Sequence, residues 1–67
     1  MYTITNPQLP FYIIRINKLI ELTCLSRSTI WRRVHAGEFP RPLKLGGRSI
    51  GWKSTDVIEY LEALPRA

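Results

Sequence analysis

The alternation of hydrophobic and polar positions predicts two short helices in the first half of the chain. Asn17 is a candidate N-cap for a helix that runs through Thr23, with apolar residues on one side and charged residues on the other. Ser26 is a candidate N-cap for a second helix, and Gly37 is placed to end that helix in a left-handed conformation. Only a short turn separates the two helices, and this arrangement is typical of a helix-turn-helix.

The segment after the second helix has the pattern of a β-hairpin. Pro40 and Pro42 cannot continue a helix, because proline lacks an amide donor and its ring clashes with the preceding turn. Apolar residues then alternate with other residues over positions 43–45 and again over positions 50–52, with two glycines between the runs. We therefore expect a hairpin with a basic tip, whose turn either consists of the glycines alone or is longer by a residue or two.

The last part of the chain predicts a third helix. Ser54 is a candidate N-cap, Asp56 lies in the first turn, where the helix dipole favours a negative charge, and Pro65 ends the helix. Four apolar residues have the spacing of one helix face, namely Val57, Ile58, Leu61 and Leu64. We expect the core to include five residues of the hairpin and this helix, namely Ile50, Trp52, Val57, Ile58 and Leu61.

Prolines also mark the beginning of the chain. Residues 1–10 contain two X-Pro pairs and predict an irregular arm, because each proline restricts the residue before it. The aromatic and β-branched run over residues 11–14 forms either a strand or a segment packed over the core. The whole pattern predicts an α+β, mostly α, winged helix-turn-helix domain over residues 11–64, with a two-stranded wing and a tail over residues 65–67.

Length and composition limit the chain to one small domain. A chain of 67 residues buries only about 60% of its unfolded surface, which supports a single core at most. Its 45% hydrophobic and 22% charged residues are the balance of a globular domain. Cys24 is the single cysteine, which excludes an intramolecular disulfide and the zinc sites that need two or more cysteines. We expect no metal and no cofactor.

The most apolar stretch does not predict a membrane span. Residues 9–22 are too few to cross a bilayer and are interrupted by charged residues, and no signal pattern opens the chain. We therefore expect a cytoplasmic protein without a membrane partner.

The positive charge of the chain is concentrated in its middle. The formal net charge is +5, and seven of the ten lysines and arginines lie between residues 27 and 53, where Glu38 is the only acidic residue. Three of the five acidic residues follow that stretch. This separation indicates one electropositive surface for a polyanion with an acidic element behind it, although a solvated basic face without a partner has the same pattern.

Four segments in consistent order carry a family resemblance: 25–32 (LSRSTIWR), 37–40 (GEFP), 43–48 (LKLGGR) and 50–52 (IGW). Together they resemble the AlpA family of phage and prophage regulators, over a region from about residue 14 to residue 64. The resemblance implies a DNA-binding winged helix, similar to excisionases and MerR-type proteins, that activates integrase genes or promotes excision. The chain departs from the family at Cys24, where the turn usually has glycine, and at Arg33, where an apolar residue is common.

The second helix is the candidate recognition helix. A major groove admits one α-helix, whose outward side chains reach base edges and phosphates. With Ile30 and Val34 toward the core, the helical period turns Arg32 outward, and a guanidinium can bind guanine through two hydrogen bonds. We predict Arg41 and Lys53 as secondary phosphate contacts. The nine residues that we predict to bind DNA are Arg27, Ser28, Thr29, Trp31, Arg32, Arg33, His35, Lys44 and Arg48.

Several of these residues also suit a purely structural role. Ser28 and Thr29 suit helix N-terminal chemistry equally well, and Trp31 belongs either to the core or to the contact surface. His35 is more often an exposed helix residue than a contact. Lysine and arginine in a hairpin also protect an exposed strand edge from pairing.

The chain lacks the parts of an enzyme. One histidine, one cysteine and five acidic residues show no nucleophile-base spacing, phosphate loop or metal motif. We therefore predict a non-enzymatic, sequence-specific transcriptional regulator of a phage or integrative element that acts on integrase or excision genes. An excisionase is the alternative within DNA binding, and a protein-interaction module is the alternative of another class.

The expected partner is double-stranded DNA, with no small-molecule substrate. A single small module buries little DNA surface, so useful specificity requires further copies on adjacent sites or a partner protein. RNA polymerase and an integrase are the candidate protein partners. Binding to DNA would weaken steeply with salt, whereas binding to a protein would resist moderate salt.

Overall fold

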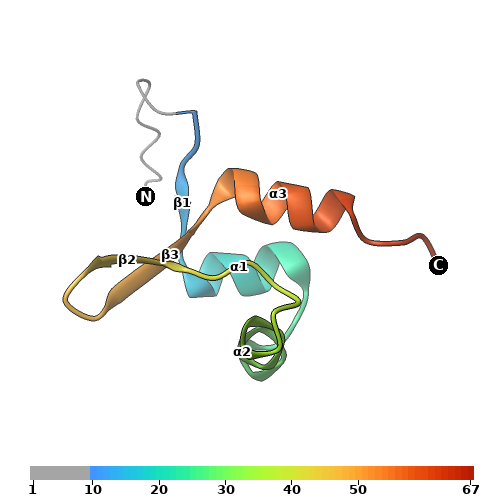
Figure 1. Ribbon diagram of the computed structural model, residues 1–67, viewed down its shortest axis with the longest axis horizontal. Coiled ribbons are helices and arrows are strands. Elements are labelled where there is room, and N and C mark those ends of the chain that lie inside the picture. Colours follow the sequence, from blue (N-terminus) through green and yellow to red (C-terminus); the bar gives the residue numbers. More distant parts are fainter. Residues whose placement is uncertain (1–9) are drawn as a thin grey trace.

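The computed structural model describes residues 10–67 and has the α+β, mostly α, winged helix-turn-helix fold that the sequence predicted (Figure 1). The predicted arm over residues 1–10 lies outside the described residues except for Pro10. The elements follow in the order β1 (Ile13–Ile14), α1 (Ile16–Thr23), α2 (Arg27–His35), β2 (Leu43–Gly46), β3 (Ser49–Lys53) and α3 (Ser54–Glu62).

Helix α1 begins two residues earlier than the sequence predicted. Its N-cap is Arg15, whose side chain makes no capping hydrogen bond, so the prediction of Asn17 as N-cap is wrong. The Asn17 side chain accepts a hydrogen bond from Nη2 of Arg27 on α2 instead, at 3.1 Å. The polar group that was expected to hold the start of α1 therefore links the two helices.

Both predicted ends of α2 are confirmed. The Ser26 hydroxyl accepts a hydrogen bond from the Thr29 N–H at 3.1 Å, which satisfies one of the free donors of the first turn. Gly37, with φ of 78°, follows the C-cap residue. The Gly37 N–H donates to Val34 O at 3.1 Å and the Glu38 N–H to Arg33 O at 2.8 Å, the pair of bonds that defines a Schellman motif.

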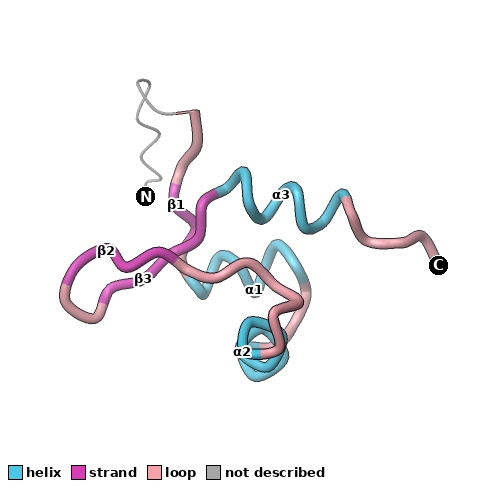
Figure 2. The backbone as a smooth tube through the Cα atoms, in the orientation of Figure 1, coloured by secondary structure: helices cyan, strands magenta, loops and turns pink. Residues whose placement is uncertain are grey.

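The predicted two-stranded wing is confirmed as β2 and β3, and a third strand, β1, joins it in one sheet. Its order is β1-β3-β2, and both pairs are antiparallel. The run over residues 11–14 therefore contains a strand, because Ile14 pairs with Trp52. Figure 2 shows the β2–β3 hairpin extending away from the helices, as a wing does.

The tip of the wing is a tight turn. Gly46 pairs with Ser49, so only Gly47 and Arg48 lie between the paired residues. Gly46 and Gly47 have φ of 122° and 55°, values that side chains rarely allow. The register shifts between Lys44 and Gly46, which is the irregularity of a β-bulge. The basic tip is therefore confirmed, and its turn has two residues but is shifted by one from the two glycines, because Gly46 belongs to β2 and Arg48 to the turn.

Helix α3 starts directly at the end of β3. Ser54 is its first residue and Lys53 its N-cap, so the prediction of Ser54 as N-cap is wrong. Ser54 is buried, its hydroxyl accepts a hydrogen bond from the Tyr12 N–H at 3.0 Å, and its own N–H donates to Tyr12 O at 2.8 Å. Tyr12, just before β1, thus forms hydrogen bonds with the serine that the sequence predicted as the N-cap of α3.

The core joins every element except β2, whose four residues are all exposed. At its centre the fully buried Trp52 donates a hydrogen bond from Nε1 to Pro40 O at 2.8 Å, and Phe39 packs against its edge. The buried apolar residues are Ile14, Leu19, Ile30, Val34, Phe39, Trp52 and Val57.

Two of the five predicted core residues lie on the surface. Trp52 and Val57 are buried, and Ile50 is partly buried against the core. Ile58 and Leu61 are 48% and 37% exposed, so their assignment to the core is wrong. Helix α3 packs through Val57 and the flank that carries Tyr60, which leaves the neighbouring apolar positions uncovered. No helix within residues 10–67 has the length and apolarity that a membrane crossing requires.

Candidate functional site

The outer face of α2 is the exposed face of the helix-turn-helix. Ile30 and Val34 anchor the helix in the core. The helical period then places Ser28, Arg32 and His35 on the opposite side, and all three are exposed. The predicted outward row is therefore present, with Arg32 at its middle.

The hydroxyls at the start of α2 have different local roles. The Ser26 hydroxyl donates to Oγ1 of Thr29 at 2.9 Å and accepts the Thr29 N–H, so Thr29 belongs to the capping arrangement. The Ser28 side chain has no hydrogen bond to any part of the chain that the structure describes. Of the two candidates, Ser28 is the one whose hydroxyl is available on the exposed face.

The two flanking arginines of α2 point to different neighbours. Arg27 is exposed and its guanidinium donates to the Asn17 side chain of α1. Arg33 is half-buried and its Nη1 donates to the Tyr60 hydroxyl of α3 at 2.8 Å. Arg33 is thus held on the α3 side of the helix, apart from the row that contains Arg32.

Trp31 contacts the core and the surface at the same time. Its ring centroid lies 5.7 Å from that of the buried Trp52 and 6.0 Å from that of the exposed His35, with which it stacks. The side chain is half-buried and packs against the core cluster. The packing of Trp31 against the core is therefore established, and its role as a contact residue stays a prediction.

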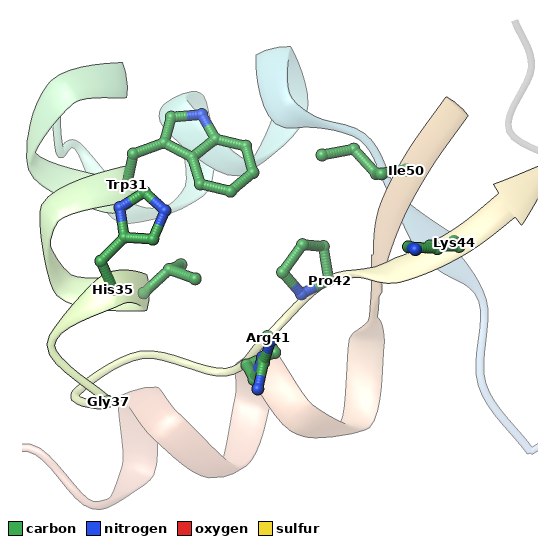
Figure 3. A pocket seen from close by; sticks show the side chains of 8 residues that line it. Trp31, His35, Gly37, Arg41, Pro42, Lys44 and Ile50 are labelled. Carbon is green, nitrogen blue, oxygen red and sulfur yellow. The ribbon is translucent and has the colours of Figure 1, made fainter. Parts of the chain in front are cut away.

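A pocket of about 460 Å³ separates α2 from the wing. Figure 3 shows Trp31 and His35 on the helix and Lys44 on the wing strand, with Arg41 and Pro42 on the segment between them. The remaining lining residues are Val34, Gly37 and Ile50. The floor is largely apolar, and the exposed Arg41 and Lys44 supply positive charge at its edge.

The structure brings Arg41, Lys44 and His35 to the same pocket, whereas the sequence had predicted them as separate candidates. Pro42 and Ile50 were not predicted as part of any site. The signal for them is the alternation in the hairpin, because Ile50 pairs with Lys44 and so lies on the same face of the sheet.

The other two wing cations lie elsewhere. Arg48 is exposed in the turn at the tip. Lys53, at the far end of β3, lies 5.0 Å from the centroid of the Phe11 ring, a cation–π distance. Within residues 10–67 no three metal-binding side chains gather into a candidate metal site.

Comparison with known proteins finds relatives over most of the chain. A family model described as "Prophage CP4-57 regulatory protein (AlpA)" matches residues 12–64, which contain α2, the wing and α3. A protein of Enterobacteria phage P4, described as "Uncharacterized protein ORF88", is 35% identical over 48 residues, which cover 72% of this chain and 54% of the phage protein. The chain thus spans about half the length of this curated relative.

Proposed function

The chain belongs to the AlpA family of prophage regulatory proteins, as its sequence motifs predicted, and we propose that it binds double-stranded DNA as a non-enzymatic transcriptional regulator of a phage or integrative element. The observation that carries this proposal is the exposed row Ser28, Arg32 and His35, which lies beside a pocket edged by Arg41 and Lys44. A rigid helix with an outward arginine fits the major groove, and cations on an adjoining hairpin fit the phosphates that flank it.

In this proposal the nine candidate residues have unequal roles. Arg32 reads bases, and Ser28, Trp31 and His35 support it by contacts to bases or to the DNA backbone. Lys44, Arg48 and Arg41 bind phosphates, and Arg27 adds a phosphate contact at the start of α2. Thr29 holds the helix N-terminus, and Arg33 holds α2 to α3. The gene targets we propose are integrase or excision genes, with the protein acting in the cytoplasm.

The proposal is tested by titrating the protein against a random-sequence duplex pool and against the sequences selected from it, at several salt concentrations. Each neutralised phosphate contributes about −0.9 to the slope of log K against log salt, so binding should weaken steeply with salt. Arg32→Ala should lower affinity for the selected sequence by about tenfold or more and reduce discrimination against random DNA, because a bidentate contact is worth about 1–3 kcal/mol.

The matched control is Arg66→Ala, which removes the same charge from the exposed segment after α3. This variant should keep the preference for the selected sequence. Equal losses in the two variants would contradict the role of Arg32 in base reading. Absence of salt-sensitive binding to any duplex would overturn DNA binding itself.

A further inference from the structure

The outer face of the wing carries an apolar patch that the DNA-binding proposal does not use. Leu43 and Leu45 are 39% and 42% exposed. Leu43 is the cross-strand partner of Gly51, and a Cβ at Gly51 would meet side-chain atoms of Leu45 and of Ile13. Leu43, Leu45 and Ile13 therefore share one face of the sheet, which we call the wing patch. Lys44, which alternates with the two leucines, turns to the pocket on the other face.

Helix α3 carries a second uncovered apolar feature. Ile58 and Leu61 on the helix, and Leu64 two residues after its end, recur at intervals of three residues, and each is more than one-third exposed. We call them the α3 ridge. Glu59 and Glu62 are exposed beside it. The ridge lies off the core-facing flank of the helix and is exposed in the part of the chain that the structure describes.

The two apolar features have opposite charge around them. The chain has no acidic residue between Glu38 and Asp56, and Lys53, the cross-strand partner of Ile13, lies on the same face of the sheet as the wing patch. It has no basic residue between Lys53 and Arg66, so every ionised side chain of α3 is negative. Pairing two wings or two α3 helices brings like charges together, whereas pairing a wing with α3 brings opposite charges together.

We propose that the wing patch of one copy packs against the α3 ridge of a second copy, so that copies join head to tail along DNA. The inference rests on the proposed DNA binding. The pocket, which Trp31 and His35 of α2 line together with Lys44, lies on the other face of the sheet from the wing patch, so both contacts can be made at once. A head-to-tail contact uses a different surface on each copy and can continue from copy to copy.

The size of the patches sets the conditions for this contact. Three side chains on each surface are far fewer than the 20–30 residues a side, or roughly 800 Å² per partner, of a stable interface. The protein should therefore be monomeric in solution and associate only where DNA raises the local concentration of a second copy. The longest dimension of the molecule, 35 Å, equals about one helical turn of DNA. Sites about one turn apart would place the copies on the same side of the duplex.

The test compares duplexes that carry one or two copies of the selected binding site, spaced about 10.5 base pairs apart. We expect the second copy to bind about tenfold more tightly than an isolated copy, a coupling of ordinary size. Leu45→Gln in the wing patch and Ile58→Gln in the α3 ridge should each abolish this coupling and keep single-site affinity. Leu22→Gln is the matched control, because Leu22 is a similarly exposed leucine of α1, outside both features.

Mixing the two variants distinguishes head-to-tail from symmetric contact. In the mixture, the intact wing of the Ile58→Gln copy can meet the intact ridge of the Leu45→Gln copy, so coupling should return in part. A symmetric contact leaves a mutated surface in every mixed pair and predicts no recovery. No recovery, or independent binding of the unaltered protein at the two sites, would overturn this inference alone. Failure to bind the single-site duplex would overturn the proposed function and this inference together.

Discussion

At the residue scale, Cys24 has a left-handed backbone conformation that glycine adopts more readily. It is the one non-glycine residue of the described part of the chain with a positive φ, 60°, and it ends α1 by donating its N–H to Ile20 O at 2.9 Å. A left-handed conformation costs an ordinary residue roughly 1 kcal/mol. The position is exposed and lies in the turn between α1 and α2, and its thiol makes one long hydrogen bond, 3.9 Å, to Glu21 O.

Cys24→Gly should therefore stabilise the protein by about 0.5–1 kcal/mol, because glycine adopts a positive φ without the Cβ clash. Urea unfolding followed by circular dichroism measures the change in the free energy of unfolding. Cys24→Ala is the control, since it removes the thiol and keeps the Cβ. An equal gain in both variants would show that the thiol, and not the backbone conformation, lowers stability.

At the scale of the element, α2 is the helix whose two ends are best defined by its own sequence. Ser26 caps its first turn, and the Gly37 motif closes its last turn. Both devices use residues within five positions of each other, so neighbouring elements are not needed to form them. This local definition gives the outward row of α2 a fixed orientation before any ligand binds.

Ser26→Ala should lower the free energy of unfolding by about 1 kcal/mol, because it leaves the Thr29 N–H without its acceptor. Ser28→Ala, two residues later on the exposed face, should change stability by less than about 0.5 kcal/mol and act on DNA affinity instead. Thermal unfolding and duplex titration of both variants measure the two effects. A reversed ranking in stability would contradict the assignment of Ser26 as the cap.

At the scale of the whole molecule, one small core has to hold the recognition helix, the wing and α3 in fixed positions. The hydrogen bond from Arg33 to Tyr60 joins α2 to α3 across 27 positions of sequence, beside the contact of Phe39 with Tyr60 at 4.5 Å between ring centroids. A side chain that the sequence marks as a DNA candidate thus has a structural partner in the described part of the molecule.

Arg33→Met and Tyr60→Phe should each lower the free energy of unfolding by about 1 kcal/mol, because each removes one partner of a part-buried hydrogen bond. The double variant should lose less than the sum, since the same bond is removed only once. Arg33→Met should leave the salt dependence of DNA binding unchanged. A slope that falls by about 0.9 would instead identify Arg33 as a phosphate contact.

The sequence by itself determined the order of the elements from α1 to α3, the turn between the helices, the ends of α2 and the outward row on that helix. These features depend on residues close in sequence: prolines that stop a helix, a serine that caps a turn three residues on, a glycine with positive φ, and the helical period around Ile30 and Val34. The family resemblance, confirmed over residues 12–64, rests on the same local motifs.

Only the tertiary structure decided which polar groups meet across the fold and which apolar residues stay outside the core. Ser54 pairs with Tyr12 across 42 positions, and Arg33 reaches Tyr60, so long-range partners replaced or supplemented the local roles that the sequence indicated. The same packing buries Val57 and leaves Ile58 exposed. Periodicity shows that a helix has an apolar side. How much of that side is buried depends on the area of the elements that pack against it, and a local sequence pattern does not contain that area.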